Sequence, residues 1–163
     1  MVDPPFFRTV LAQWASGVVV VTTVSDADGH RYGMTASSFT SVATDPPLIS
    51  VCLASAGTTY RMIRRSGVFA VSVLGHDHTS ISRRFATADS PYSDRFAEGR
   101  WDTAWTGAPV LADAPAWLDC VVTACHQAGD HTILLGSVQD AATPRPVAPL
   151  VYHARTYYEG LLR

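Results

Sequence analysis

The residues whose types and spacing best suit chemistry are small hydroxyl side chains within residues 33–58. The run carries Asp45 as its one charged residue and includes Thr35, Ser37, Ser38, Thr40, Ser41, Ser55 and Thr58. Short donors and acceptors of this kind would bind a polar, planar or phosphorylated ligand by hydrogen bonds rather than ion pairs. A solvated strand edge is the other interpretation, because Ser and Thr are common in turns and on strand faces.

A short helix is predicted directly after this run, from Thr58 to Ser66. Ser55 or Thr58 would cap its start, and Gly67 would end it. The free N–H groups at a helix N-terminus favour a phosphate. The segment therefore predicts a ligand cradle that lacks a nucleophile–base pair.

Histidines at two places invite other interpretations. His76 and His78 have no clear third metal ligand, and Asp77 between them also suits the cap of a helix that carries Ile81 and Phe85, so we predict no metal site. His131 follows Gly129–Asp130 at a predicted turn. There it either projects toward a ligand or is a solvated turn histidine, and both interpretations stay open.

The three cysteines lie in apolar, strand-like runs, which favours reduced thiols in the core. They are Cys52, Cys120 and Cys125. Cys120 and Cys125 have opposite parity along one predicted strand. We therefore expect them on opposite faces of the sheet.

Composition narrows the function further. All 12 basic residues are arginines, which excludes a Schiff-base lysine and a Walker-type lysine. The 163 residues predict a single domain over 1–163, and a net charge of −2 gives no electrostatic footprint for nucleic acid. No apolar run is as long as a membrane helix and the first residues lack the pattern of a signal peptide, so we expect a cytoplasmic protein without membrane contact.

Apolar periodicity predicts an N-terminal helix from Asp3–Pro4 to Gly17, with a stripe packed in the core. The stripe comprises Phe6, Phe7, Val10, Leu11 and Trp14. Strands are predicted over 18–24, 31–35, 48–53, 68–74, 117–125, 132–138 and 150–158, with a hairpin turn at 26–29. Residues 87–107 predict a long surface loop anchored by Trp101 and Trp105. Many strands and few helices favour an antiparallel barrel or sandwich.

Seven segments carry a resemblance to a known family. They are 7–23 (FRTVLAQWASGVVVVTT), 32–53 (YGMTASSFTSVATDPPLISVCL), 66–74 (SGVFAVSVL), 82–86 (SRRFA), 106–122 (TGAPVLADAPAWLDCVV), 129–138 (GDHTILLGSV) and 149–158 (PLVYHARTYY). In this order and spacing they resemble the flavin reductase family, the small NAD(P)H:flavin oxidoreductase components of two-component monooxygenases. The resemblance covers nearly the whole chain.

The resemblance implies a mainly β fold, the FMN-binding split barrel, an antiparallel Greek-key β-barrel with a few short helices. It implies a homodimer with flavin near the subunit interface. The implied reaction is hydride transfer from NADH, with NADPH possible, to FAD, with FMN possible. Reduced flavin would then pass to a separate monooxygenase, hydroxylase or halogenase. Two other functions stay open, a flavoprotein oxidase with tightly bound FMN and a non-enzymatic flavin-binding module on the same barrel.

The resemblance also implies where the cofactors bind. The flavin ring falls on Met34, Thr35, Ala36, Ser37 and Ser38, and the ribityl chain and phosphates fall on Cys52, Leu53, Ala54, Ser55 and Thr58. Arg83, Arg84 and Phe85 match a stretch near the phosphate or adenosine end of the flavin, whereas Asp130, His131 and Tyr157 match the nicotinamide side. His131 is the one predicted catalytic residue, because it would orient the nicotinamide amide or phosphate.

Overall fold

The computed structural model describes residues 2–87 and 95–160. Its helices are α1 (Pro4–Leu11), α2 (Thr58–Ser66) and α3 (Thr79–Ala86). Its strands are β1 (Ser16–Gly17), β2 (Val19–Val24), β3 (Arg31–Ala36), β4 (Thr40–Thr44), β5 (Pro47–Ala54), β6 (Val68–Val73), β7 (Trp101–Thr103), β8 (Pro109–Leu111), β9 (Ala116–Ala128), β10 (His131–Ala142), β11 (Leu150–His153) and β12 (Thr156–Glu159). The prediction of a mainly β chain with a few short helices is confirmed.

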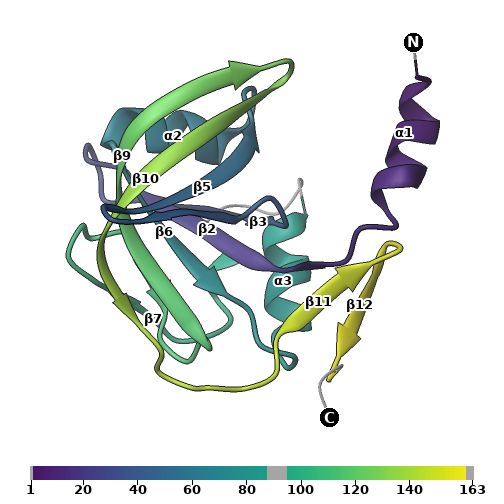
Figure 1. The fold of residues 1–163 in the computed structure, drawn as a ribbon. Coiled ribbons are helices and arrows are strands. Elements are labelled where there is room, and N and C mark those ends of the chain that lie inside the picture. The colour runs from purple at the N-terminus through teal and green to yellow at the C-terminus, as the bar shows by residue number, and fades with distance from the viewer. Residues whose placement is uncertain (1, 88–94, 161–163) are drawn as a thin grey trace.

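One seven-stranded antiparallel sheet, in the order β3-β2-β6-β9-β10-β5-β4, forms the body of the molecule. It curls into a split-barrel-like shape in which β5 and the ends of β9 and β10 next to their shared turn lie above β2 and β6, while the other ends of β9 and β10 extend below them (Figure 1). The β2–β3 hairpin forms where the sequence predicts it, with Val24 opposite Arg31 and Gly29 in the left-handed region at φ 69°. β2 also pairs with β6, so strands that are distant in sequence are neighbours in the sheet.

Side chains alternate between the two faces of each strand, and those on the inner face fill the barrel. Along β5, Ile49, Val51 and Leu53 are buried and join Phe69 of β6 and Leu134 of β10 in the main core cluster. The side chains between them on β5 point to the other face and are half-buried. Because strand side chains alternate between faces, this face of β5 is free to present its polar groups to a ligand.

The helix α2 has the predicted bounds and the predicted end. Gly67 follows it at φ 73° and donates its N–H to the carbonyl of Ile63 at 2.8 Å. The prediction that Ser55 or Thr58 caps the helix is wrong. The N-cap is Gly57, and no side chain caps the start of the helix. The hydroxyl of Ser55 instead pairs with that of Thr132 at 2.8 Å, and Thr58 accepts from Arg61 at 2.9 Å.

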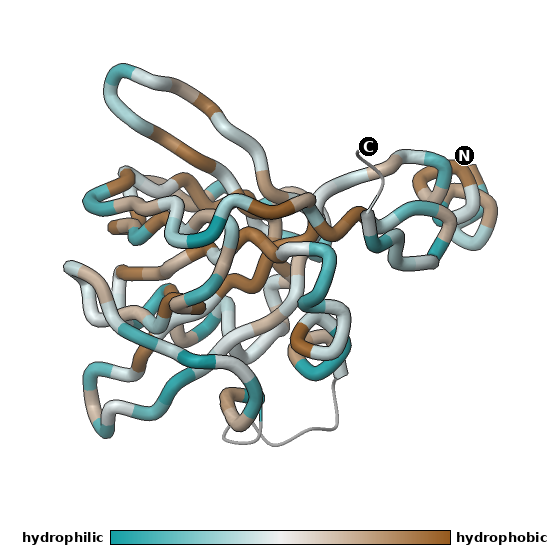
Figure 2. Tube along the Cα trace, turned by 90° about the horizontal axis from the view of Figure 1, so that it is seen from below, coloured by the Kyte–Doolittle hydropathy of each residue, from teal (hydrophilic) through white to brown (hydrophobic). Residues whose placement is uncertain are grey.

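The N-terminal helix α1 begins as predicted, with the Asp3 carboxylate accepting from the N–H of Phe6 at 3.3 Å. It ends at Leu11 rather than at Gly17, and none of its residues is buried. The prediction that its apolar stripe packs in the core is wrong, since Trp14 just after it is 77% exposed and Phe6 is 61% exposed. The helix stands away from the barrel (Figure 2).

The last predicted strand, 150–158, is two strands. β11 and β12 pair as a hairpin, and its turn places Ala154 and Arg155 in the left-handed region at φ 48° and 62°. The hairpin lies beside α1 (Figure 1), because the N–H of Ala154 donates to the carbonyl of Ala12 at 2.8 Å. The sequence 150–158 did not reveal this turn, because the turn contains neither glycine nor proline.

The expected opposite placement of Cys120 and Cys125 is also wrong. Both side chains belong to the main core cluster. The register of β9 against β10 shifts between Leu135 and Gly136, so that Thr123 of β9 is an extra residue. A bulge of this kind resets strand parity and returns Cys125 to the face of Cys120.

The predicted surface loop over 87–107 lies partly outside the described residues, which exclude 88–94. Its later part contains β7, and Trp101 packs against Phe85 and Phe96 at ring distances of 5.2 and 5.0 Å. Trp101 is thus an anchor as predicted, whereas Trp105 is 69% exposed. No helix within 2–87 or 95–160 is both long and apolar enough to cross a membrane.

Candidate functional site

The hydroxyl run lies where β3 passes into β4 and is held by neighbours distant in sequence. Thr35 donates to the carbonyl of Ser82 on α3 at 2.6 Å. Ser38 donates to the carbonyl of Cys52 at 2.7 Å and accepts from the N–H of Cys52 at 3.1 Å. The two segments predicted to hold flavin, 34–38 and 52–55, are therefore joined directly.

Two cavities adjoin this run. The larger, of about 1150 Å³, opens between α1 and the barrel and is lined by Ser37, Ser38 and Phe39 on the barrel side. The smaller, of about 200 Å³, is lined by Thr35, Ala36, Ser37 and Tyr157. Ser37 borders both, so the hydroxyl run faces ligand-sized hollows, which favours the ligand-binding interpretation over the solvated edge.

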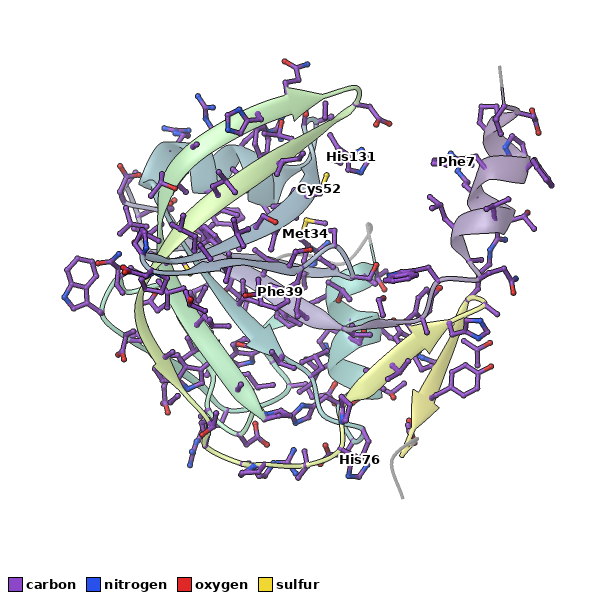
Figure 3. All side chains as sticks on the ribbon, in the orientation of Figure 1. Phe7, Met34, Phe39, Cys52, His76 and His131 are labelled. Atoms are coloured by element: carbon purple, nitrogen blue, oxygen red, sulfur yellow. The ribbon has the colours of Figure 1, made fainter. Side chains whose placement is uncertain are left out.

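His131 is brought beside the same site by the pairing of β10 with β5. It lies opposite Ala54, and the N–H of Ser55 donates to the carbonyl of Asp130 at 3.0 Å. His131, Cys52 and Met34 lie on the side of the barrel that faces α1 (Figure 3). The predicted nicotinamide side and the predicted flavin segments thus share one face of the molecule.

The imidazole of His131 is half exposed and is held by Asp130. Its Nδ1 lies 2.7 Å from the Asp130 carboxylate. The pKa of Asp130 lies below its ordinary value, chiefly because His131 hydrogen-bonds to it, with a smaller electrostatic contribution from Arg8 of α1. A carboxylate on Nδ1 favours the proton there and leaves Nε2 as the acceptor in the neutral ring.

The segment 82–86, which lies on α3, contributes both surface and core residues. Arg83 lies over the ring of Tyr157 at 5.7 Å, and Tyr157 accepts a hydrogen bond from Ser82 at 2.9 Å. Arg84 pairs with Glu98 at 3.2 Å. Phe85 is 1% exposed and packs in the second core cluster, so it positions α3 and does not present its ring to a ligand.

The remaining predicted site residues contribute in different ways. Leu53 is 1% exposed, so only its backbone is available. Met34 packs against the main core cluster, while Cys52, Ala54, Ser55 and Thr58 are half-buried along β5 and at the start of α2. None of these residues lines either of the two cavities.

Sequence reasoning missed several residues that line the larger cavity. They are Arg8, Leu11, Trp14, Val18, Tyr152 and Arg155. Tyr152 borders both cavities and stacks on Tyr157 at 5.0 Å. The signal that could have found them is the exposed apolar stripe of α1 together with the tyrosines near the C-terminus, but only the fold brings the two ends together.

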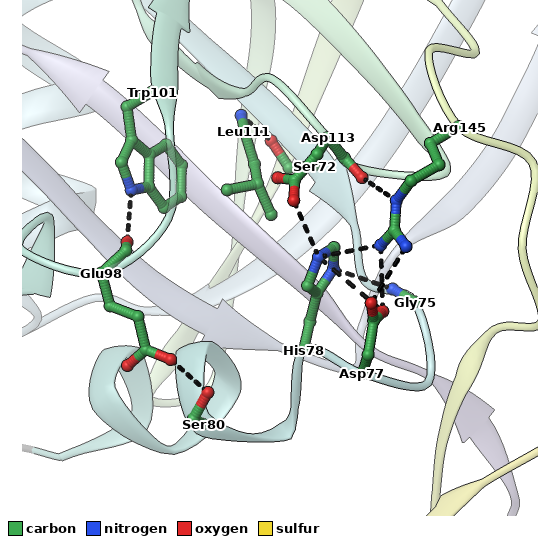
Figure 4. Close-up of polar contacts among 10 residues, drawn as sticks. All are labelled: Ser72, Gly75, Asp77, His78, Ser80, Glu98, Trp101, Leu111, Asp113 and Arg145. Carbon is green, nitrogen blue, oxygen red and sulfur yellow. Dashed lines mark hydrogen bonds and ion pairs between the residues drawn. The ribbon is translucent and has the colours of Figure 1, made fainter.

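A second polar cluster lies elsewhere (Figure 4). Asp77, predicted to cap α3, instead accepts from both terminal nitrogens of Arg145 at 2.9 and 3.0 Å. His78 is 4% exposed, and its Nδ1 accepts from the N–H of Gly75 at 3.1 Å. The cluster ties the segment before β11 to the start of α3, which is a structural task.

The described residues contain no three His, Cys, Asp or Glu side chains placed to hold a metal. Burial raises the pKa of the Cys120 thiol to about 12, so it stays protonated and inert. The donor set of the site consists of hydroxyls, backbone groups, arginines and one histidine beside apolar hollows. This set fits a flavin and a nicotinamide, which need hydrogen bonds and stacking rather than an acid–base dyad.

Comparison with known proteins agrees with this fit. The model of the flavin reductase like domain matches residues 11–161. The chain is 42% identical over 136 residues to a Rhizobium meliloti (strain 1021) protein named "Probable flavin reductase", covering 83% of this chain and 42% of that protein. It is 34% identical over 160 residues to HsaB, the reductase subunit of a flavin-dependent monooxygenase of Rhodococcus jostii (strain RHA1), covering 98% and 79%.

A solved structure extends the comparison to three dimensions. The Streptomyces globisporus C-1027 NADH:FAD oxidoreductase SgcE6, in complex with NAD and FAD fragments, superposes with a TM-score of 0.86 at 33% identity. The match covers 97% of this chain and 94% of that one. This chain spans less than half the length of the Rhizobium relative. Because the family model matches most of its residues, the chain belongs to the flavin reductase-like family.

Proposed function

We propose that the protein is an NADH-dependent flavin reductase that transfers hydride from NADH to FAD, with FMN and NADPH as the other candidate cofactors. The observation that carries this proposal is the pairing of β10 with β5. In this pairing His131 lies opposite Ala54, which supports a nicotinamide side next to the proposed flavin segments. Hydride transfer requires the two rings to stack closely, which this arrangement allows.

The flavin and nicotinamide supply the redox chemistry when bound, and the chain binds and orients them. Donors around Thr35–Ser38 would hydrogen-bond the polar edge of the flavin ring and stabilise negative charge there. Backbone groups of 52–55 and the uncapped N-terminus of α2, with Thr58, would hold the ribityl chain and phosphate. His131, oriented by Asp130, would hold the nicotinamide amide or phosphate.

The reduced flavin would pass to a separate monooxygenase, hydroxylase or halogenase. The Rhodococcus relative is named as the reductase subunit of a monooxygenase, which supports this assignment. The three cysteines are free thiols and the proposed electron donor is an intracellular cofactor, so we place the protein in the cytoplasm.

The chain would act as one domain over 1–163 and as a homodimer. The seven-stranded sheet draws strands from both halves of the sequence, which supports a single folding unit. The apolar stripe of α1 is exposed, and an eight-residue helix is too short to be stable without packing. A second copy of this chain would cover that stripe.

The test is the loss of nicotinamide absorbance when the protein is mixed aerobically with NADH or NADPH and a trace of FAD, FMN or riboflavin. We expect oxidation that saturates with added flavin and is fastest with NADH and FAD. Oxidation by no pair would contradict the proposal. Yellow colour that survives dialysis would then indicate a flavoprotein with tightly bound FMN, and reversible flavin binding alone would indicate a binding module.

A further inference from the structure

Among residues 2–87 and 95–160, the charged side chains that line the larger cavity are two arginines, and neither belongs to the predicted site. Arg8 lies on α1, and Arg155 lies at the turn between β11 and β12. The rest of the lining is apolar or hydroxyl-bearing. Two positive charges at the edge of an apolar hollow suit a ligand with a flat apolar body and an anionic group.

The fold brings these two arginines into the lining of one cavity although 147 positions separate them in sequence (155 − 8). The N–H of Ala154, next to Arg155, donates to the carbonyl of Ala12, whose own N–H donates to the carbonyl of Arg8. The pairing of Ser16 with Tyr152 fixes the same junction from the barrel side. Both guanidinium groups therefore start from one backbone junction at the cavity mouth.

The conformation at Arg155 is uncommon. Ala154 and Arg155 both occupy the left-handed region, which side-chain-bearing residues rarely adopt. A two-residue hairpin turn of type I′ requires this conformation at both of its central residues, so the β11–β12 hairpin fixes the position of Arg155. Here the turn holds Arg155 in the lining of the larger cavity.

Both charges are also available. Among residues 2–87 and 95–160, no carboxylate lies within ion-pair distance of either guanidinium group. The charge of Arg8 also contributes to the lowered pKa of Asp130, the neighbour of His131. An anion entering the mouth would meet two arginines that have no ion pair to break.

We propose that Arg8 and Arg155 together bind the phosphate groups of a nucleotide ligand while its ring enters the hollow beside Ser37 and Tyr152. This rests on the proposed function and adds to it an anion subsite separate from the N-terminus of α2, which would hold the phosphate that Arg8 and Arg155 do not bind. The phosphate belongs either to the flavin nucleotide or to the nicotinamide dinucleotide. Both present the same chemistry to a guanidinium group, which forms paired hydrogen bonds to phosphate oxygens.

The experiment compares ligands with and without phosphate on Arg8→Gln and Arg155→Gln. Flavin binding is measured without nicotinamide, as quenching of riboflavin, FMN and FAD fluorescence. The Michaelis constants for NADH and for reduced nicotinamide mononucleotide are measured with riboflavin as acceptor. Arg100→Gln is the matched control, since Arg100 is exposed and does not line the cavity.

We expect each variant to weaken binding of the phosphorylated ligand about tenfold and to leave riboflavin binding unchanged. Lysine at either position should restore part of the affinity, because it keeps the charge but loses the paired geometry. Weaker FMN and FAD binding would assign the subsite to the flavin phosphate. A raised Michaelis constant for NADH alone would assign it to the dinucleotide pyrophosphate.

Unchanged affinity for every phosphorylated ligand would overturn the proposal, and so would an equal loss for riboflavin and FMN, which would indicate lost packing rather than lost charge. Either result leaves wild-type NADH oxidation intact, so it is distinguishable from failure of the reductase assignment. Thermal unfolding of each variant, expected within a few degrees of wild type, confirms that the fold is retained.

Discussion

The imidazole of His131 is held by its neighbour Asp130 at the mouth of a turn and not by the core. We expect His131→Ala to raise the Michaelis constant for NADH about tenfold, the effect of one lost hydrogen bond of about 1.4 kcal/mol. Flavin affinity, measured by fluorescence quenching, should change little. His126→Ala, exposed on β9 near the same turn, is the control. Equal turnover and equal NADH affinity in wild type and His131→Ala would contradict the assigned role.

Asp77 shows how a single pair sets a dependence on pH. The hydrogen bond from Arg145 holds the pKa of Asp77 at about 2, below its ordinary value near 3.8. A depressed pKa in the folded state means that the pair stabilises the protein above about pH 4 and that this stability is lost as pH falls toward 2.

We therefore expect Asp77→Asn to lower the free energy of unfolding at pH 7 by about 1 kcal/mol, a value kept small because water screens the 44%-exposed carboxylate. Urea unfolding at pH 7 and at pH 2.5 measures the difference, which should shrink at the lower pH. Asp102→Asn, exposed on β7, should show no such trend. A difference that stayed constant from pH 7 to pH 2.5 would refute this account.

At the scale of elements, the backbone of β10 at Gly136 packs closely against the ring of Phe69 on β6. A Cβ atom on Gly136 would lie 2.5 Å from Cζ of Phe69, whose ring is fully buried. We expect Gly136→Ala to lower the free energy of unfolding by about 1–3 kcal/mol, because the core cannot move the ring without strain. Chemical denaturation checks this. Gly17→Ala, where a Cβ would meet nothing within 4 Å, is the matched control and should cost far less.

The arrangement of the elements also determines which residues border the cavities. The β11–β12 hairpin carries Tyr152 and Tyr157 to the cavities, and its start is fixed by hydrogen bonds between Leu150 and Leu74 and between His76 and Ala148. The Asp77–Arg145 pair fastens the segment that precedes it. The polar cluster of Figure 4 therefore helps to fix the segment from which the β11–β12 hairpin starts.

At the scale of the whole molecule, the exposed stripe of α1 predicts self-association. We expect the protein to sediment at twice the 17.5 kDa of one chain, because burial of Phe6, Phe7 and Val10 favours a dimer. Val10→Asp should weaken the dimer at least about tenfold in analytical ultracentrifugation, since burying a lone carboxylate is costly. Thr9→Asp, on the polar side of α1, should leave the dimer intact. A monomeric wild type at all concentrations would rule the dimer out.

Much of this protein was determined by its sequence alone. The β-branched run of β2, the turn at Gly29 and the left-handed end at Gly67 follow from local propensity, so the hairpin and α2 formed as predicted. The residue types of the hydroxyl run predicted a ligand cradle, whereas the GDH turn was assigned to the nicotinamide side by the family resemblance, and both assignments stay predictions.

Tertiary structure alone decided the rest, because the deciding contacts join residues far apart. Local parity could not reveal the bulge at Thr123 that turns Cys125 into the core. An amphipathic pattern shows that α1 has an apolar face, but not whether the barrel covers it. Asp77 binds Arg145 rather than capping α3, and Arg8 and Arg155 line the same cavity, only because folding brings distant segments together. Local sequence sets the shape of each segment, whereas long-range packing decides which segments become neighbours.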